Sequence, residues 1–294
     1  MKKYIFLILC CSVFVFSSCS EKYQRISFDS NFLEEELVQY VNEKTMIVDV
    51  TDESFPAQLP IYEITEREIS REEFLSMLQK LNISENGSSE YFSLDGNKIT
   101  GSLSSITDTA RGYFEMSDND LEKLAWSTFE KIPFLDGEYE YLGIKSKTTI
   151  SDSEGTHITR IGVSFRKLLD DIRVVGNDQC YLYFDGSGLV EMNIELYNYE
   201  EIGTMTLVAL DDAATKIKTP DAFSIDVQNT TQTMAIAETL QVDRVKLLLV
   251  NQYTQGCTIL QPVYNFIGTA FDGKGIEATF NSTVIAIPDS YTYE

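Results

Sequence analysis

The single histidine, His157, limits the catalytic chemistry that this sequence can support. A histidine-dependent triad would depend on it alone, and no Gly-x-Ser-x-Gly motif accompanies it. It follows the polar residues 151–155, which are typical of an exposed turn. Zinc sites of familiar spacing need several His or Cys ligands, and the sequence has no such group. The residues therefore predict neither a catalytic histidine nor a zinc site.

Carboxylates are abundant, with 46 Asp and Glu against 23 Lys and Arg. Pairs of them occur at Glu34 and Glu36, Glu72 and Glu73, Asp118 and Asp120, Asp170 and Asp171, and Asp211 and Asp212. By residue type these pairs would suit carboxylate-dependent hydrolysis or calcium binding, and both stay open. Asp118, Asp120, Asp211 and Asp212 are also explained as residues at helix starts. Asp185 and Asp272 are explained as turn residues. We predict no catalytic residues, no metal and no cofactor.

The N-terminal residues have the pattern of an export signal. Lys2 and Lys3 precede an apolar run, Tyr4–Phe16, which has the length of a signal-peptide core and is shorter than a membrane span. The following Ser17-Ser18-Cys19 resembles the lipobox of bacterial lipoproteins, although Phe16 stands where that family usually has Leu. The resemblance implies that the Cys19 thiol receives a diacylglyceryl group and becomes the mature N-terminus.

Such a protein is extracytoplasmic and anchored through Cys19 to a bacterial membrane, either the cell membrane or the outer membrane. The alternative is an ordinary secretory signal that leaves Cys19 unmodified. Cys180 and Cys257 then remain, and they could pair in an oxidising compartment. Cys180 shares a strand face with Leu182 and Phe184, which indicates a core thiol, and we predict no disulfide.

Helix and strand patterns position these residues in an α+β fold. Ser70 and Glu73 form a capping box, and Ser117 with Asp120 suits a second helix start. The second helix has an apolar stripe of Leu121, Leu124, Ala125, Thr128, Phe129 and Ile132. Alternating strands follow, and further helical turns are expected at 31–43, 211–217 and 230–239. We predict tandem modules of antiparallel sheet, each with a helix on one face.

Two turns of similar sequence indicate an internal repeat. Phe184-Asp185-Gly186-Ser187-Gly188 returns 87 residues later as Phe271-Asp272-Gly273-Lys274-Gly275. The predicted organisation is a signal peptide (1–18), an acidic tether (19–58), a small α+β module (59–116) and two related modules (117–200 and 201–294).

The pattern around the first turn resembles the PepSY-type module. The closest stretches are Arg160–Arg166, Ile172–Asn177, Tyr181–Phe184 and the turn itself, while Leu260–Phe266 is similar to the last strands of YycI-like proteins. Those proteins are membrane-anchored regulators of a cell-wall sensor kinase. The Leu169-Asp170-Asp171 stretch departs from the Gly-containing turn of this pattern. The resemblance implies a non-enzymatic extracytoplasmic protein that binds or restrains another protein.

Four tyrosines form the candidate binding surface: Tyr181, Tyr183, Tyr197 and Tyr199. The first two lie on the strand face opposite Cys180, and they suit peptide or glycan binding if no helix covers them. Packing beneath loops is the alternative. The net charge of −23 makes nucleic acid an unfavourable partner. The predicted function is binding or regulation of a cell-envelope protein; a carrier of a peptide, glycan or small ligand and a carboxylate-dependent hydrolase are the alternatives.

Overall fold

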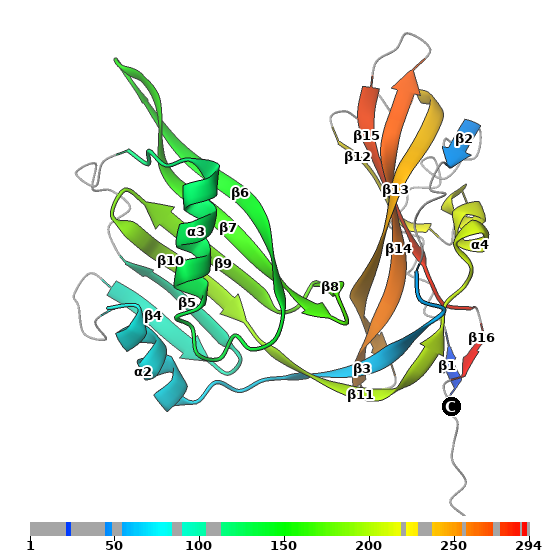
Figure 1. Cartoon of the computed structure of the whole chain (residues 1–294), viewed down its shortest axis with the longest axis horizontal. Coiled ribbons are helices and arrows are strands. Elements are labelled where there is room, and N and C mark those ends of the chain that lie inside the picture. Colours follow the sequence, from blue (N-terminus) through cyan, green and yellow to red (C-terminus); the bar gives the residue numbers. More distant parts are fainter. Residues whose placement is uncertain are drawn as a thin grey trace, which may run out of the picture.

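The computed structural model shows two β-rich lobes joined by a pair of long strands (Figure 1). It describes residues 22–24, 45–48, 55–83, 90–103, 113–218, 222–228, 237–254, 257–272, 277–288 and 290–292. The predicted helix at 31–43 and the Cys19 anchor lie outside these ranges. Most strand pairs are antiparallel and the helices are short, which confirms the α+β class.

The first lobe is a six-stranded antiparallel arrangement with two helices on one face (Figure 1). In sheet order its strands are β6 (Tyr139–Asp152), β7 (Gly155–Leu169), β9 (Gln179–Asp185), β10 (Gly188–Glu195), β5 (Lys98–Leu103) and β4 (Glu90–Asp95). The helices are α2 (Arg71–Lys80) and α3 (Asp118–Phe129). Their apolar sides share one core with alternate residues of β7, β9 and β10.

Both helices begin where the sequence predicts. The Ser70 hydroxyl accepts from the Glu73 backbone N–H, and the Glu73 carboxylate accepts from the Ser70 N–H, which completes the capping box. At α3 the Ser117 hydroxyl accepts from the Asp120 N–H at 3.2 Å. Leu121 and Ala125 of the predicted stripe are fully buried against the sheet.

The second lobe is a twisted antiparallel sheet beside a short helix. Its strands are β12 (Ala222–Gln228), β15 (Glu277–Ile285), β14 (Cys257–Asp272) and β13 (Ala237–Thr254), with β2 (Thr45–Val48) parallel to β13. Helix α4 (Leu210–Thr215) and the 3-10 turn η3 (Lys216–Lys218) pack on its core. The expected helical turn at 230–239 is wrong at its end, because Ala237–Thr239 belong to β13; residues 230–236 lie outside the described ranges. A separate pair, β1 (Lys22–Gln24) and β16 (Ser290–Thr292), lies beside this lobe (Figure 1).

Three strands connect the lobes. β3 (Gln58–Glu66) pairs with β11 (Tyr197–Thr206), and both run from one lobe to the other (Figure 1). β8 (Ile172–Val175) pairs antiparallel with β7 and parallel with β13, so one hydrogen-bonded path crosses the molecule. Four buried side chains fill the junction: Ile64, Val174, Leu249 and Leu260.

The predicted small module, 59–116, contributes to both lobes. Leu59 and Ile61 on β3 belong to the second-lobe core, whereas Phe74 and Ile99 belong to the first-lobe core. Its β4–β5 hairpin extends the sheet of the first lobe through β10. The predicted domain boundaries stay predictions. In the structure, residues of the predicted small module belong to the sheets and cores of both lobes.

Candidate functional site

The sheet of the first lobe has a polar face on the side away from α2 and α3. This polar face consists of Arg160, Gly162, Ser164, Arg166, Gln179, Tyr181, Tyr183, Glu191, Asn193, Glu195, Lys98, Thr100 and Ser102. Strand alternation produces it, because Cys180, Leu182 and Phe184 point into the core. Asn193 and Thr100 are paired at its centre and both are exposed, so solvent reaches this side of the sheet.

Tyr181 and Tyr183 are held on the polar face by arginines of the neighbouring strand. The Arg160 guanidinium lies 4.4 Å from the Tyr183 ring centroid and forms an ion pair with Glu191. The Arg166 Nη2 donates to the Tyr181 hydroxyl at 2.8 Å. Cross-strand cation–π contacts of this kind order both rings before any partner arrives.

Gly162 allows the Tyr183 ring to lie flat across the sheet. A Cβ at position 162 would come within 2.5 Å of that ring and within 2.4 Å of the Ser146 Oγ. Ser164, the next residue on this face of β7, is fully buried and is paired with Tyr181 of β9. The part of the polar face on β7 and β9 is therefore a packed layer of tyrosine rings and guanidinium groups.

Tyr197 and Tyr199 lie elsewhere, at the junction between the lobes. Both pack against the junction core, and the Tyr197 hydroxyl donates to the Glu195 carboxylate. Burial raises the pKa of Tyr199, and the neighbouring Asp178 carboxylate raises it further. The structure thus places two of the four predicted tyrosines on one surface and assigns the other two a packing role.

Asp178 is a buried carboxylate at this junction. It is 2% exposed, its φ is +46°, and its Oδ1 accepts from the Tyr197 backbone N–H at 2.9 Å. Burial raises the pKa of Asp178 to about 6, although the hydrogen bonds that it accepts act in the opposite direction. The adjacent Asn177 accepts a hydrogen bond from Asn251 on β13, so the β8–β9 loop contacts both lobes.

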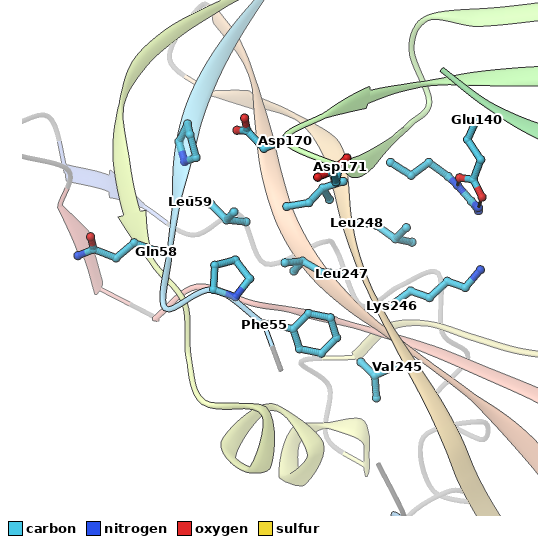
Figure 2. A pocket seen from close by; sticks show the side chains of 14 residues that line it. Phe55, Gln58, Leu59, Glu140, Asp170, Asp171, Val245, Lys246, Leu247 and Leu248 are labelled. Atoms are coloured by element: carbon cyan, nitrogen blue, oxygen red, sulfur yellow. Dashed lines mark hydrogen bonds and ion pairs between the residues drawn. The ribbon is translucent and has the colours of Figure 1, made fainter. Parts of the chain in front are cut away.

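A cavity of about 720 Å³ lies where the lobes meet (Figure 2). Three distant segments line it: the start of β3, the β7–β8 turn with β8 and nearby Glu140, and the middle of β13. Its apolar lining consists of Phe55, Pro56, Leu59, Pro60, Ile172, Val245, Leu247 and Leu248. Its size and its apolar surface fall in the range of small-molecule and peptide sites.

The β7–β8 turn brings two aspartates to the cavity. Asp170 and Asp171 have φ values of +50° and +63°. Among residues with a side chain, Asp adopts this left-handed conformation more readily than most. The Tyr62 hydroxyl donates to Asp170 Oδ2 at 2.6 Å, and burial together with this carboxylate raises the pKa of Tyr62. Glu140 and Arg173 form a two-bond ion pair at 2.7 and 2.8 Å.

The other predicted residues have no part in these two sites. Cys180 is a fully buried thiol, Cys257 is partly exposed, and neither is in a disulfide. His157 stacks on Tyr113 near the tip of the β6–β7 hairpin, with 3.8 Å between ring centroids. Within the described ranges, no cluster of three His, Cys, Asp or Glu side chains could hold a metal, and no helix has the length and apolarity of a membrane span.

Comparison with known proteins gives a distant structural similarity. No protein-family profile and no curated protein sequence matches the chain. A crystal structure of YycH from Bacillus subtilis is similar over 76% of this chain, with a TM-score of 0.42 and 10% identity. The similarity covers 51% of YycH, so this chain spans about half of that protein. At this level it gives no information on function.

Sequence reasoning missed the cavity. Its lining comes from residues 55, 56, 58–60, 140, 170–173 and 245–248, and only strand pairing brings these together. The usable signal was the Asp170-Asp171 pair, which occupies a two-residue turn between Leu169 and Ile172. Strand alternation, by contrast, was enough to place Tyr181 and Tyr183 on the polar face.

Proposed function

We propose that this protein is a non-enzymatic lipoprotein, anchored outside the cytoplasm through Cys19, that binds and regulates another protein of the cell envelope. The observation that carries the proposal is the polar face with its ordered Tyr181, Tyr183, Arg160 and Arg166. Tyr and Arg are enriched in protein interfaces, and rings that are already ordered lose less entropy on binding.

The charge distribution supports this surface as the docking side. The chain has a net charge of −23, yet the polar face carries Lys98, Arg160 and Arg166 against two carboxylates. Two of these cations are already paired, Lys98 with Glu195 and Arg160 with Glu191. A partner would therefore bind a nearly neutral, aromatic surface. The rest of the protein surface is acidic and would repel other acidic proteins.

Site-specific photo-crosslinking in intact cells tests the proposal. A photoreactive residue at Asn193 or Thr100 samples the exposed centre of the polar face, and one at Ser127 on the exposed side of α3 is the matched control. We expect one discrete envelope-protein adduct from Asn193 and Thr100 and none from Ser127. Arg160→Gln should reduce the adduct, because Arg160 orders Tyr183. Equal labelling from all three positions would contradict the proposal.

The anchor has a separate test. Cys19→Ala should move the protein from the membrane fraction to the soluble fraction and abolish metabolic labelling with palmitate. Retention in the membrane without label would mean that another segment anchors the chain.

The cavity favours a second candidate function, a carrier or receptor of a small ligand or peptide. An apolar volume of about 720 Å³ with a few charged groups at its rim is the arrangement expected for such a site. Leu248→Trp should fill part of the cavity and weaken any ligand held there. Native mass spectrometry of the protein purified from its own cells would detect that ligand as an added mass, which the variant lacks.

A further inference from the structure

The polar face and the cavity are connected along one side of the sheet. On β7, Arg166 belongs to the polar face, and Leu168 is the next residue on that side of the strand. Leu168 pairs with Arg173 of β8, and Arg173 pairs with Leu248 of β13. Residues that pair across neighbouring strands project from the same side of a sheet. Arg173 and Leu248 both line the cavity, so the polar face leads to it without a change of side.

Glu140 on β6 links the two sites through its side chain. It pairs with Arg166 of β7, so both project on the polar side, and its carboxylate forms the two-bond ion pair with Arg173. Glu140 also lines the cavity, and Figure 2 shows it across the cavity from Leu59. The side chains of Glu140 and Arg173 are 41% and 22% exposed, so a partner can reach them. Arg166, Glu140 and Arg173 thus form a charged row between the two sites.

The charged row has one positive charge in excess. Glu140 compensates Arg173, whereas Arg166 forms no ion pair within the described ranges. Arg166 is partly buried, its Nη2 donates to the neutral Tyr181 hydroxyl, and its buried Nη1 has no hydrogen-bond partner there. A partly buried charge gains more from a nearby carboxylate than an exposed one does. On a chain with a net charge of −23, this cation favours an acidic group of a partner.

The cavity at the end of the charged row has a mainly apolar lining. Leu247 and Val245 are 8% and 2% exposed, and Leu59 is 5% exposed, so part of its wall belongs to the second-lobe core. Phe55 packs against the same core. Protein interfaces gain much of their binding free energy where an anchor side chain fills a desolvated pocket. This lining suits aliphatic or aromatic anchors.

We infer that the polar face and the cavity form one docking surface for an extended segment of the envelope-protein partner. The segment places apolar anchor side chains in the cavity, crosses the ion pair of Glu140 and Arg173, and presents an acidic residue to Arg166. It is extended because it spans β7, β8 and β13. This inference rests on the proposed function and adds the chemistry of the bound segment. It assigns the cavity to the partner protein and not to a free small ligand.

Photo-crosslinking in intact cells tests the inference from the cavity side. A photoreactive residue at Lys246, which lines the cavity, should give the same envelope-protein adduct as one at Asn193. Leu248→Trp fills part of the cavity and should lower the adduct yield from Asn193 about tenfold, the size expected when an anchor pocket is blocked. Strands β8, β7 and β9 lie between β13 and β10, so the new ring does not contact residue 193 itself.

Substitutions at Arg166 test the acidic residue of the segment. Arg166→Gln should lower the adduct yield from Asn193 about tenfold, whereas Arg166→Lys keeps the charge and should retain most of the adduct. The matched controls are Ile150→Trp and Lys131→Gln, which introduce the same residues at exposed positions outside both sites and should leave the yield unchanged. Urea unfolding of each purified variant shows whether the fold is retained.

The outcomes separate this inference from the proposed function. No matching adduct from Lys246, or full yield from Asn193 in a folded Leu248→Trp variant, would overturn the inference while the proposed function stands. If Leu248→Trp does not fold, the Lys246 adduct decides alone. Equal yields in Arg166→Gln and Arg166→Lys would remove the acidic residue from the inference. A small-molecule mass on the purified protein that Leu248→Trp lacks would assign the cavity to a carrier function. If Asn193 gives no discrete adduct, the proposed function falls and the inference falls with it.

Discussion

Replacing Asp178 by asparagine should stabilise the protein at alkaline pH. The native state holds this carboxyl with a pKa of about 6, against an ordinary value of 3.8, because burial penalises the charged form. A native pKa above the unfolded value means that the folded chain binds the proton more tightly. The ionised carboxylate therefore destabilises the fold, and this penalty is absent below about pH 4, grows as pH rises to about 6 and is constant above that.

The size of the effect follows from the two pKa values. Their separation corresponds to about 3 kcal/mol of unfolding free energy at pH 8. Asn keeps an oxygen for the Tyr197 N–H, can donate toward Tyr199 and tolerates the φ of +46°. Asp178→Asn should then be more stable than the wild type by up to about 3 kcal/mol at pH 8, and equal to it near pH 4.

Urea unfolding of the chain from residue 20 onward, followed by circular dichroism from pH 4 to pH 8, measures this difference. Asp95→Asn is the matched control, because Asp95 is exposed on the first-lobe hairpin. A stability difference that does not change with pH would refute the reasoning. So would a variant that is less stable than the wild type at pH 8, since the carboxylate would then be a net stabilising group.

Three further substitutions test the packing that positions the sites, each by urea unfolding. Ser117→Ala removes the side-chain cap of α3 and should cost about 1 kcal/mol, whereas Ser117→Asp should restore most of it. Phe165→Ala empties the centre of the first-lobe core and should cost about 3–5 kcal/mol, with Phe165→Leu costing less. Gly162→Ala should cost about 1–3 kcal/mol by displacing the Tyr183 ring, and a Tyr183→Ala background should remove most of that cost. An unchanged cost in that background would show that the ring is not the obstacle.

Local patterns in the sequence predicted most of the elements but not their long-range partners. The caps at Ser70 and Ser117 and the alternation around Cys180 depend on neighbours within a few residues, and the structure has them as expected. The pairing of β3 with β11 depends on residues more than a hundred positions apart, and no local pattern encodes it. The cavity depends on another long-range pairing, that of β8 with β13, which is why it was not predicted.

The position of Pro262 in the sheet agrees with a local rule about prolines in strands. A proline lacks an N–H, so a position at a strand edge or bulge is expected. In the structure β14 pairs with β13 along its length, and its other edge is shared by two strands. On that edge β14 pairs with β3 as far as Ile259, and its pairing with β15 begins at Val263. Pro262 therefore lies in the gap between the two pairings.

The two similar turns bear on how the lobes are related. Leu182 pairs with Met192 in the first hairpin, and Thr269 pairs with Thr279, each 87 residues later, in the second. The hairpin register is therefore shared. The register of the preceding strand differs between the two lobes. Val163 pairs with Leu182 in the first lobe, whereas Val250, which is 87 residues later, pairs with Gln261 and not with Thr269. In the first lobe β8 separates β7 from β9 and reaches across to β13, while β13 and β14 follow each other directly. The repeat stays a prediction, and the strand that interrupts it in the first lobe is the one that joins the lobes and forms a wall of the cavity.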